Sequence, residues 1–164
     1  MICGGKAMRT IWVSSPIGDV SIIDQTRLPE TLAVVSLAEV EAAAHAIRSM
    51  QVRGAPLIGV AAAYGMSLAA RRDPSDEAMA RAEALLASTR PTAVNLAWAL
   101  AEIHAVWKEL LPDARAAGCY DKAAAMADAD VASCRAIALA GAERLLAHRR
   151  GGEPLRVLTH CNAG

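Results

Sequence analysis

Residues 52–72 read Val52-Arg53-Gly54-Ala55-Pro56-Leu57-Ile58-Gly59-Val60, then Ala61-Ala62-Ala63-Tyr64-Gly65-Met66-Ser67-Leu68-Ala69-Ala70-Arg71-Arg72. After the Gly/Pro break at its start, this stretch predicts a helix of small residues over positions 57–72, because alanine is the best helix former. Helices rich in alanine pack closely through their small side chains. We therefore expect a mostly helical chain.

Segments rich in β-branched residues precede this helix. Residues 10–13 and 20–23 are predicted strands with a turn between them, and residues 31–35 could add a third short strand. Ser36 followed by Glu39 has the pattern of a capping box, which predicts a helix that begins at Ser36.

More helices are predicted after residue 72. They cover residues 75–87, with Ser75 as the cap, and residues 92–110; a loop between Pro112 and Gly118 separates these from a long helix over 121–148. Residues 155–160 then have the pattern of a buried strand, followed by a turn at 161–164. A strand in this position resembles the first strand of an α/β domain.

The composition excludes several classes of function. The chain has 17 basic and 17 acidic residues, so no net charge favours nucleic acid or an anionic membrane. Its four cysteines form no CxxC pair, and no histidine lies at zinc-finger spacing from them, which argues against structural zinc and a disulfide framework. No apolar run is long enough for a membrane span or a signal peptide. We expect a cytoplasmic protein without structural zinc.

Two arginines stand just before predicted helix starts. Arg53 precedes Gly54-Ala55-Pro56, and Arg90 precedes Pro91-Thr92. A helix N-terminus offers free N–H groups to anions, and an arginine beside it can add a charge-assisted contact to phosphate. The alternative is that each arginine pairs with a surface carboxylate. If both bind phosphate, their guanidinium groups should reach one anion.

Cys161 follows the predicted strand at 155–160 and is a candidate for chemistry. In open α/β sheets, ligands bind beyond the carboxyl ends of strands, and a thiol there can act as acid, base or nucleophile. The alternative is a small buried apolar residue. Asn95, one turn into its predicted helix, could face the same site or lie on the helix surface.

Four motifs in this order resemble the S-methyl-5-thioribose-1-phosphate isomerases of methionine salvage. They are Ile23-Asp24-Gln25-Thr26 with Leu28-Pro29, Val52-Arg53-Gly54-Ala55-Pro56 with Ile58-Gly59, Arg90-Pro91-Thr92-Ala93-Val94-Asn95-Leu96, and Thr159-His160-Cys161-Asn162-Ala163-Gly164. The resemblance covers residues 8–164. The superfamily also contains ribose-1,5-bisphosphate isomerases and regulatory subunits of the initiation factor 2B exchange factor.

The resemblance implies an α+β N-terminal unit, a small antiparallel sheet plus a mainly α-helical bundle, that ends in the first strand of a truncated Rossmann-like α/β domain. Its expected parts are an extension at 1–7, an N-terminal domain at 8–152 and the start of the Rossmann-like domain at 153–164. It also implies a homodimer when full length.

The implied activity is an aldose–ketose isomerisation of 5-methylthioribose 1-phosphate to 5-methylthioribulose 1-phosphate. The family's substrate-binding residues fall on Arg53, Gly54, Ala55 and Arg90, and its active-site cysteine falls on Cys161. Leu57 departs from the alanine that the family commonly has there. The family's catalytic aspartate lies in its C-terminal domain, so we expect residues 1–164 alone to be inactive.

Other functions remain open at this point. The chain could act on ribose 1,5-bisphosphate or 5-deoxyribose 1-phosphate, or be a non-catalytic regulatory subunit of the same superfamily. It could also be a structural fragment that only packs. Cys161 and the two arginine motifs favour the enzyme over the regulator.

Overall fold

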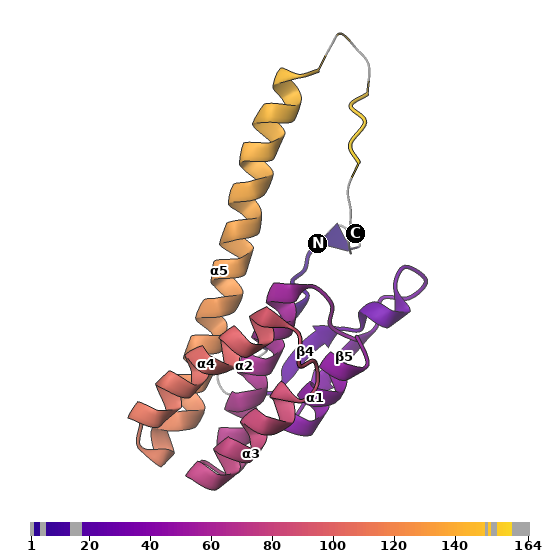
Figure 1. Cartoon of the computed structure of the whole chain (residues 1–164). Helices are drawn as coiled ribbons and strands as arrows, with labels where there is room; N and C mark the ends of the chain where they lie inside the picture. Colours follow the sequence, from indigo (N-terminus) through magenta and orange to yellow (C-terminus); the bar gives the residue numbers. More distant parts are fainter. Residues whose placement is uncertain (1, 4–5, 14–17, 150, 152–153, 159–164) are drawn as a thin grey trace. The chain divides into compact units, whose positions relative to one another are not determined.

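The computed structural model describes residues 2–3, 6–13, 18–149, 151 and 154–158. The chain forms two compact units, Met1–Ala127 and Asp128–Gly164. Helix α5 (Pro112–Ala147) contributes residues to both units (Figure 1). The first unit contains the sheet and helices α1 to α4.

A small antiparallel sheet forms the N-terminal part of the first unit. Its strands are β3 (Ile11–Val13), β4 (Val20–Ile23) and β5 (Val34–Leu37), in the order β3-β4-β5. The predicted strands at 10–13 and 20–23 are confirmed, and the third strand is at 34–37 rather than 31–35. A 3-10 turn, η1 (Gln25–Arg27), follows β4. Before the sheet, β1 (Ile2–Cys3) pairs with β2 (Lys6–Ala7).

The predicted capping box at Ser36 is wrong. Ser36 lies inside β5, opposite Ser21 of β4, and helix α1 (Val40–Arg48) begins after Glu39, whose side chain makes no capping bond. Pairing with β4 buries Leu37 against the helices, and this tertiary contact outweighs the local cap. Helix α1 turns its apolar face to the core.

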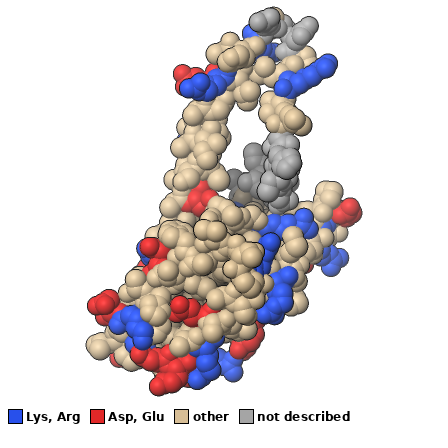
Figure 2. All heavy atoms as spheres, viewed as in Figure 1, with Lys and Arg blue, Asp and Glu red and all other residues tan. Residues whose placement is uncertain are grey.

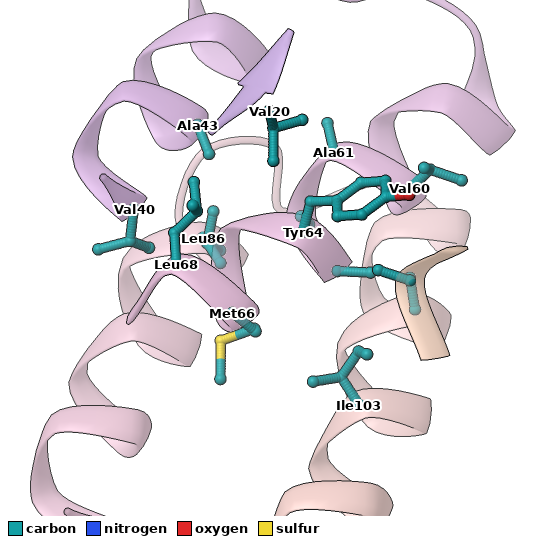
Figure 3. Packing of buried hydrophobic residues seen from close by; sticks show 14 of the residues in the cluster. Val20, Val40, Ala43, Val60, Ala61, Tyr64, Met66, Leu68, Leu86 and Ile103 are labelled. Carbon is teal, nitrogen blue, oxygen red and sulfur yellow. The ribbon is translucent and has the colours of Figure 1, made fainter. Parts of the chain in front are cut away.

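Helix α2 (Ala55–Arg72) is the central element of the first unit. All its residues from 57 to 70 are buried, and a helix that is apolar all round must be covered on every side. Helices α1, α3 (Asp76–Ala87) and α4 (Val94–Glu109) pack against it. Figure 3 shows side chains from β4 and these helices meeting around Tyr64 and Met66. As predicted, Ser75 caps α3, since its hydroxyl accepts from the Ala78 N–H.

Helix α5 begins at Pro112, so the predicted loop up to Gly118 is wrong. Proline fits the first turn of a helix, where its missing N–H has no partner to lose. Arg115, Cys119 and Ala123 are buried in the first unit. Beyond Asp128 the visible face of α5 is mostly uncharged (Figure 2). Its exposed apolar side chains are Val131, Ile137, Leu139, Leu145 and Leu146.

Residues 154–158 are described and form no strand with the described part of the chain. The rest of the strand predicted at 155–160, and the turn at 161–164, lie outside the described residues. The Rossmann-like ending therefore stays a prediction, as do the boundaries at residues 7 and 152.

Candidate functional site

The start of α2 is open and needs a glycine. Gly54 is the N-cap residue and has φ 93° and ψ 133°, in the region of positive φ that favours glycine. A Cβ on Gly54 would meet no described atom within 4 Å, and Ala55 and Pro56 are exposed. Since glycine has no side chain, the first-turn N–H groups receive no bond from the cap residue. Among the described residues, the end of the helix that carries the partial positive charge is therefore uncovered at Gly54.

Arg53 stands directly before this helix start and carries an unsatisfied donor. Its side chain is partly buried, and its Nε is buried without a hydrogen-bond partner among the described residues. A buried donor without a partner costs about 1–3 kcal/mol, so its presence in a native structure calls for a ligand or another explanation. An anion that reached this atom would satisfy it. The indole Nε1 of Trp107 is also unpartnered among the described atoms; the Trp107 ring is approached by Lys108 Nζ at 4.5 Å and by Arg115 Cζ at 5.0 Å from its centroid.

Arg90 lies in the loop before α4. It is partly buried, and its carbonyl oxygen accepts from the N–H of Ala93, the N-cap residue of α4, at 3.0 Å. The Ala93 side chain cannot cap the helix. The first turn of α4 is therefore uncapped by its own N-cap residue, as in α2.

The starts of α2 and α4 lie side by side. A Cβ added to Gly59, in the second turn of α2, would be 2.8 Å from the carbonyl oxygen of Asn95 and 3.1 Å from the Ala99 Cβ. Both residues are in the first two turns of α4. This contact places the loops that carry Arg53 and Arg90 at the same end of the bundle. Convergence of the two guanidinium groups on one anion stays a prediction. Asn95 is half-buried at this contact.

Some other arginines of the first unit, such as Arg71, Arg72 and Arg115, pair with carboxylates. Arg71 contacts Asp19 at 3.1 Å, and Arg115 contacts Asp76 at 2.7 Å. In the described part of the chain, neither Arg53 nor Arg90 is within ion-pair distance of a carboxylate. The alternative that each of the two predicted arginines serves a surface ion pair therefore has no support among these residues.

A buried carboxylate braces the loop before Arg53. Asp24 accepts bonds from the Thr26 N–H at 3.0 Å and the Thr26 hydroxyl at 2.6 Å, and Gln51 Nε2 donates to its other oxygen at 3.2 Å. The Thr26 hydroxyl, followed by the Thr26 N–H and the Gln51 amide, lowers the pKa of Asp24 against the opposing effect of burial. The bonds between Asp24 and Thr26 are local in sequence, whereas the bond to Gln51 spans 27 residues.

The structure describes the side chains of Cys119 and Cys134 but not that of Cys161. Cys161, the predicted catalytic residue, lies outside the described residues, and its role stays a prediction. Cys119 is buried, and burial raises the pKa of its thiol to about 12, which makes it a packing residue. Cys134 is exposed on α5. Among the described residues, no cluster of three or more His, Cys, Asp or Glu side chains could hold a metal ion.

A groove among the described residues lies away from this site. It has a volume of about 510 Å³ and is lined by α1, α3 and the C-terminal end of α2, at Ala69, Arg72 and Asp73. Arg72 in its wall already pairs with Glu39 and Glu41. Because the groove is at the opposite end of α2 from Gly54, it does not belong to the predicted phosphate site. No helix in the described part of the chain has the length and apolar character to cross a bilayer.

Known proteins match this chain over nearly its whole length. A methylthioribose-1-phosphate isomerase from Methylobacterium nodulans is 52% identical over 161 residues, which cover 98% of this chain and 44% of that protein. The chain thus spans about 44% of the length of such curated relatives.

Two solved structures share the fold. The 5-methylthioribose 1-phosphate isomerase from Pyrococcus horikoshii superposes with a TM-score of 0.70 and 36% identity, covering 77% of this chain and 37% of the other. The delta subunit of translation initiation factor eIF-2B from A. fulgidus gives a TM-score of 0.69 and 37% identity, covering 76% of this chain and 38% of that subunit.

The profile of the initiation factor 2 subunit family matches residues 51–164, which is well over half of the chain and includes both predicted arginines. This match, together with the named relatives, confirms the resemblance that the four motifs indicated. The chain therefore belongs to the initiation factor 2 subunit family.

Proposed function

We propose that this chain binds the phosphate of a sugar 1-phosphate and contributes to the isomerisation of 5-methylthioribose 1-phosphate to 5-methylthioribulose 1-phosphate in methionine salvage. The observation that carries the proposal is the buried Nε of Arg53, which has no hydrogen-bond partner among the described residues and stands just before the start of α2. The names of the relatives that match over 98% of the chain support it.

The proposed phosphate site combines two helix starts and two arginines. The phosphate would accept from the Ala55 N–H at the start of α2 and from the Arg53 guanidinium. Arg90 would reach it from the loop before α4, because Gly59 and Asn95 hold the two helix starts together. Phosphate is favoured here by the partial positive charge of helix N-termini and by charge-assisted hydrogen bonds.

The chemistry requires acid–base groups beyond this phosphate site. Because phosphate blocks the anomeric oxygen, the ring can open only if a group protonates the ring oxygen. Transfer of hydrogen from C2 to C1 also needs acid–base assistance. We propose Cys161 for one of these roles. We also propose the finer features that the resemblance implies: a Rossmann-like domain, a homodimer when full length, a cytoplasmic location and no cofactor.

A chimeric enzyme tests this proposal. Residues of this chain replace the matched part of the Methylobacterium nodulans relative, and conversion of 5-methylthioribose 1-phosphate is followed directly by NMR. Turnover is expected in the chimera. Loss of a charged hydrogen bond costs about 1.5–3 kcal/mol, so Arg53→Gln and Arg90→Gln should each raise KM roughly 10- to 100-fold. Cys161→Ser should lower kcat by about 10²–10⁴-fold.

Arg71→Gln is the matched control, because Arg71 is bound to Asp19 at the surface. Its kinetics should equal those of the unsubstituted chimera. Equal KM values for all three arginine variants would contradict the phosphate site, and normal turnover of Cys161→Ser would contradict the catalytic role.

A regulatory function is the second candidate, since the eIF-2B delta subunit matches the fold as well as the isomerase does. A folded chimera that turns over none of 5-methylthioribose 1-phosphate, ribose 1,5-bisphosphate and 5-deoxyribose 1-phosphate would favour it. Turnover of one of the latter two sugars alone would change the substrate but keep the reaction class.

A further inference from the structure

Asp24 is a buried carboxylate that the proposed reaction does not use. It is 6% exposed, and no Lys, Arg or His side chain in the described part of the chain forms an ion pair with it. Burying a charge is costly unless hydrogen bonds compensate. Neutral donors on Thr26 and Gln51 supply those bonds.

The two oxygens of Asp24 make different kinds of contact. Oδ1 accepts both bonds from Thr26, two residues away, and this alone would complete the local turn. Oδ2 accepts from Gln51, which is 27 residues away. A second bond runs alongside, from the Gln25 N–H to the Gln51 carbonyl oxygen at 2.9 Å. The turn after β4 is therefore hydrogen-bonded to both the side chain and the backbone of Gln51.

The two hydrogen bonds to Gln51 lie just before the proposed phosphate site in the sequence. Val52 is fully buried, and its N–H donates to the Ala46 carbonyl at 3.3 Å. On the other side of Arg53, the Gly54 carbonyl accepts the Ile58 N–H at 3.1 Å as the first bond of α2. The Arg53 backbone is thus held from both directions, which fixes the direction in which its side chain leaves the loop.

We propose that Asp24 and Gln51 are positioning residues that orient Arg53 and the start of α2 for phosphate. The proposal rests on the proposed function for its ligand, but the orientation of Arg53 can be measured without one. A turn that served only its own folding would need one oxygen of Asp24. The second oxygen ties the turn to the loop that carries Arg53.

A charge swap separates positioning from simple stability. Gln51→Glu places two carboxylates about 3.2 Å apart, and their repulsion should release the loop. Adding Asp24→Asn should restore the contact between positions 24 and 51. The amide nitrogen introduced at position 24 can donate to the carboxylate introduced at position 51, while the amide oxygen still accepts from Thr26. Gln51→Met alone, which removes the donor to Asp24 without adding a charge, serves if Gln51→Glu does not fold. Glu83→Gln is the matched control, since Glu83 accepts a bond from His104 at 2.8 Å away from this loop.

Two readouts are taken on the chain by ¹⁵N NMR. The first is the rate at which the buried Arg53 Nε–H exchanges with solvent, and the second is the dissociation constant for inorganic phosphate. Gln51→Glu should accelerate the exchange and weaken phosphate binding roughly tenfold or more, the scale of one lost charge-assisted hydrogen bond. The double variant should recover most of both, and Glu83→Gln should change neither.

Unchanged exchange and phosphate affinity in folded Gln51→Glu or Gln51→Met would overturn the proposal, as would equal effects in Glu83→Gln. If the parent chain binds no phosphate while Arg53 exchange still follows the swap, the positioning role stands and the proposed phosphate site fails. If the parent chain binds phosphate and the substitutions at residues 24 and 51 change neither readout, the phosphate site stands and the positioning role fails.

Discussion

Gly59→Ala should separate the starts of α2 and α4. The added Cβ would be 2.8 Å from the Asn95 carbonyl oxygen, a backbone atom that moves only with its helix. Overpacking of this kind costs about 1–3 kcal/mol. Replacing glycine by alanine inside a helix returns about 1 kcal/mol, so we expect a net loss of roughly 0–2 kcal/mol in the free energy of unfolding.

Gly65→Ala is the control within the same helix. Its added Cβ would meet the Ala43 Cβ at 3.1 Å and the Leu86 methyl groups at 3.3 Å. The Leu86 side chain can rotate, so the steric cost should be smaller while the propensity gain is the same. Urea unfolding followed by circular dichroism should find Gly59→Ala less stable than Gly65→Ala, by about 1 kcal/mol.

The effect on ligand binding should follow the same order. Gly59→Ala moves the loop of Arg90 relative to that of Arg53 and should weaken phosphate binding, whereas Gly65→Ala should leave it unchanged. If Gly59→Ala is as stable as Gly65→Ala and binds phosphate equally well, the close approach of α2 and α4 does not shape the site.

Three further predictions concern other parts of the chain. A thiol reagent should modify Cys134 in the native protein but reach Cys119 only on unfolding, because burial raises the pKa of Cys119 to about 12; peptide mass mapping that finds both modified alike would contradict this. Arg115→Met should destabilise the fold by about 1–3 kcal/mol in urea, since the carbonyl oxygens it serves lose their donor; an unchanged midpoint would argue against that role. The lowered pKa of Asp24 contributes stability above its ordinary pKa that is lost as pH falls through the folded pKa; Asp24→Asn should therefore flatten the acid limb of the stability profile, and an unaltered limb would contradict the shift.

Local patterns in the sequence predicted much of the fold. The β-branched segments at 10–13 and 20–23, the small-residue helix α2 and the Ser75 cap were all found, because each depends on residues close in sequence. Ser36 was misassigned because its capping pattern is local whereas its pairing with Ser21 is not. The loop expected up to Gly118 is absent because α5 already begins at Pro112, and Gly118 leaves room for the Leu110 side chain to pack against this helix.

The part of the candidate site that depends on residues close in sequence could also be predicted. Arg53 and Gly54 could be chosen from a helix start alone. The contact of Gly59 with Asn95, which places the Arg90 loop beside them, depends on how two helices pack. The hydrogen bond between Asp24 and Gln51 joins residues that are far apart in sequence, and Gln51 lies outside the four motifs.

A crystal structure of the chain with 5-methylthioribose 1-phosphate would test the central claim most directly. We expect one phosphate at the start of α2 that accepts from both Arg53 and Arg90, with charge-assisted N···O distances of about 2.7–2.9 Å. The Arg53 Nε that has no partner among the described residues should be one of the donors. A sugar phosphate bound elsewhere, or one that contacts neither arginine, would contradict the proposed site.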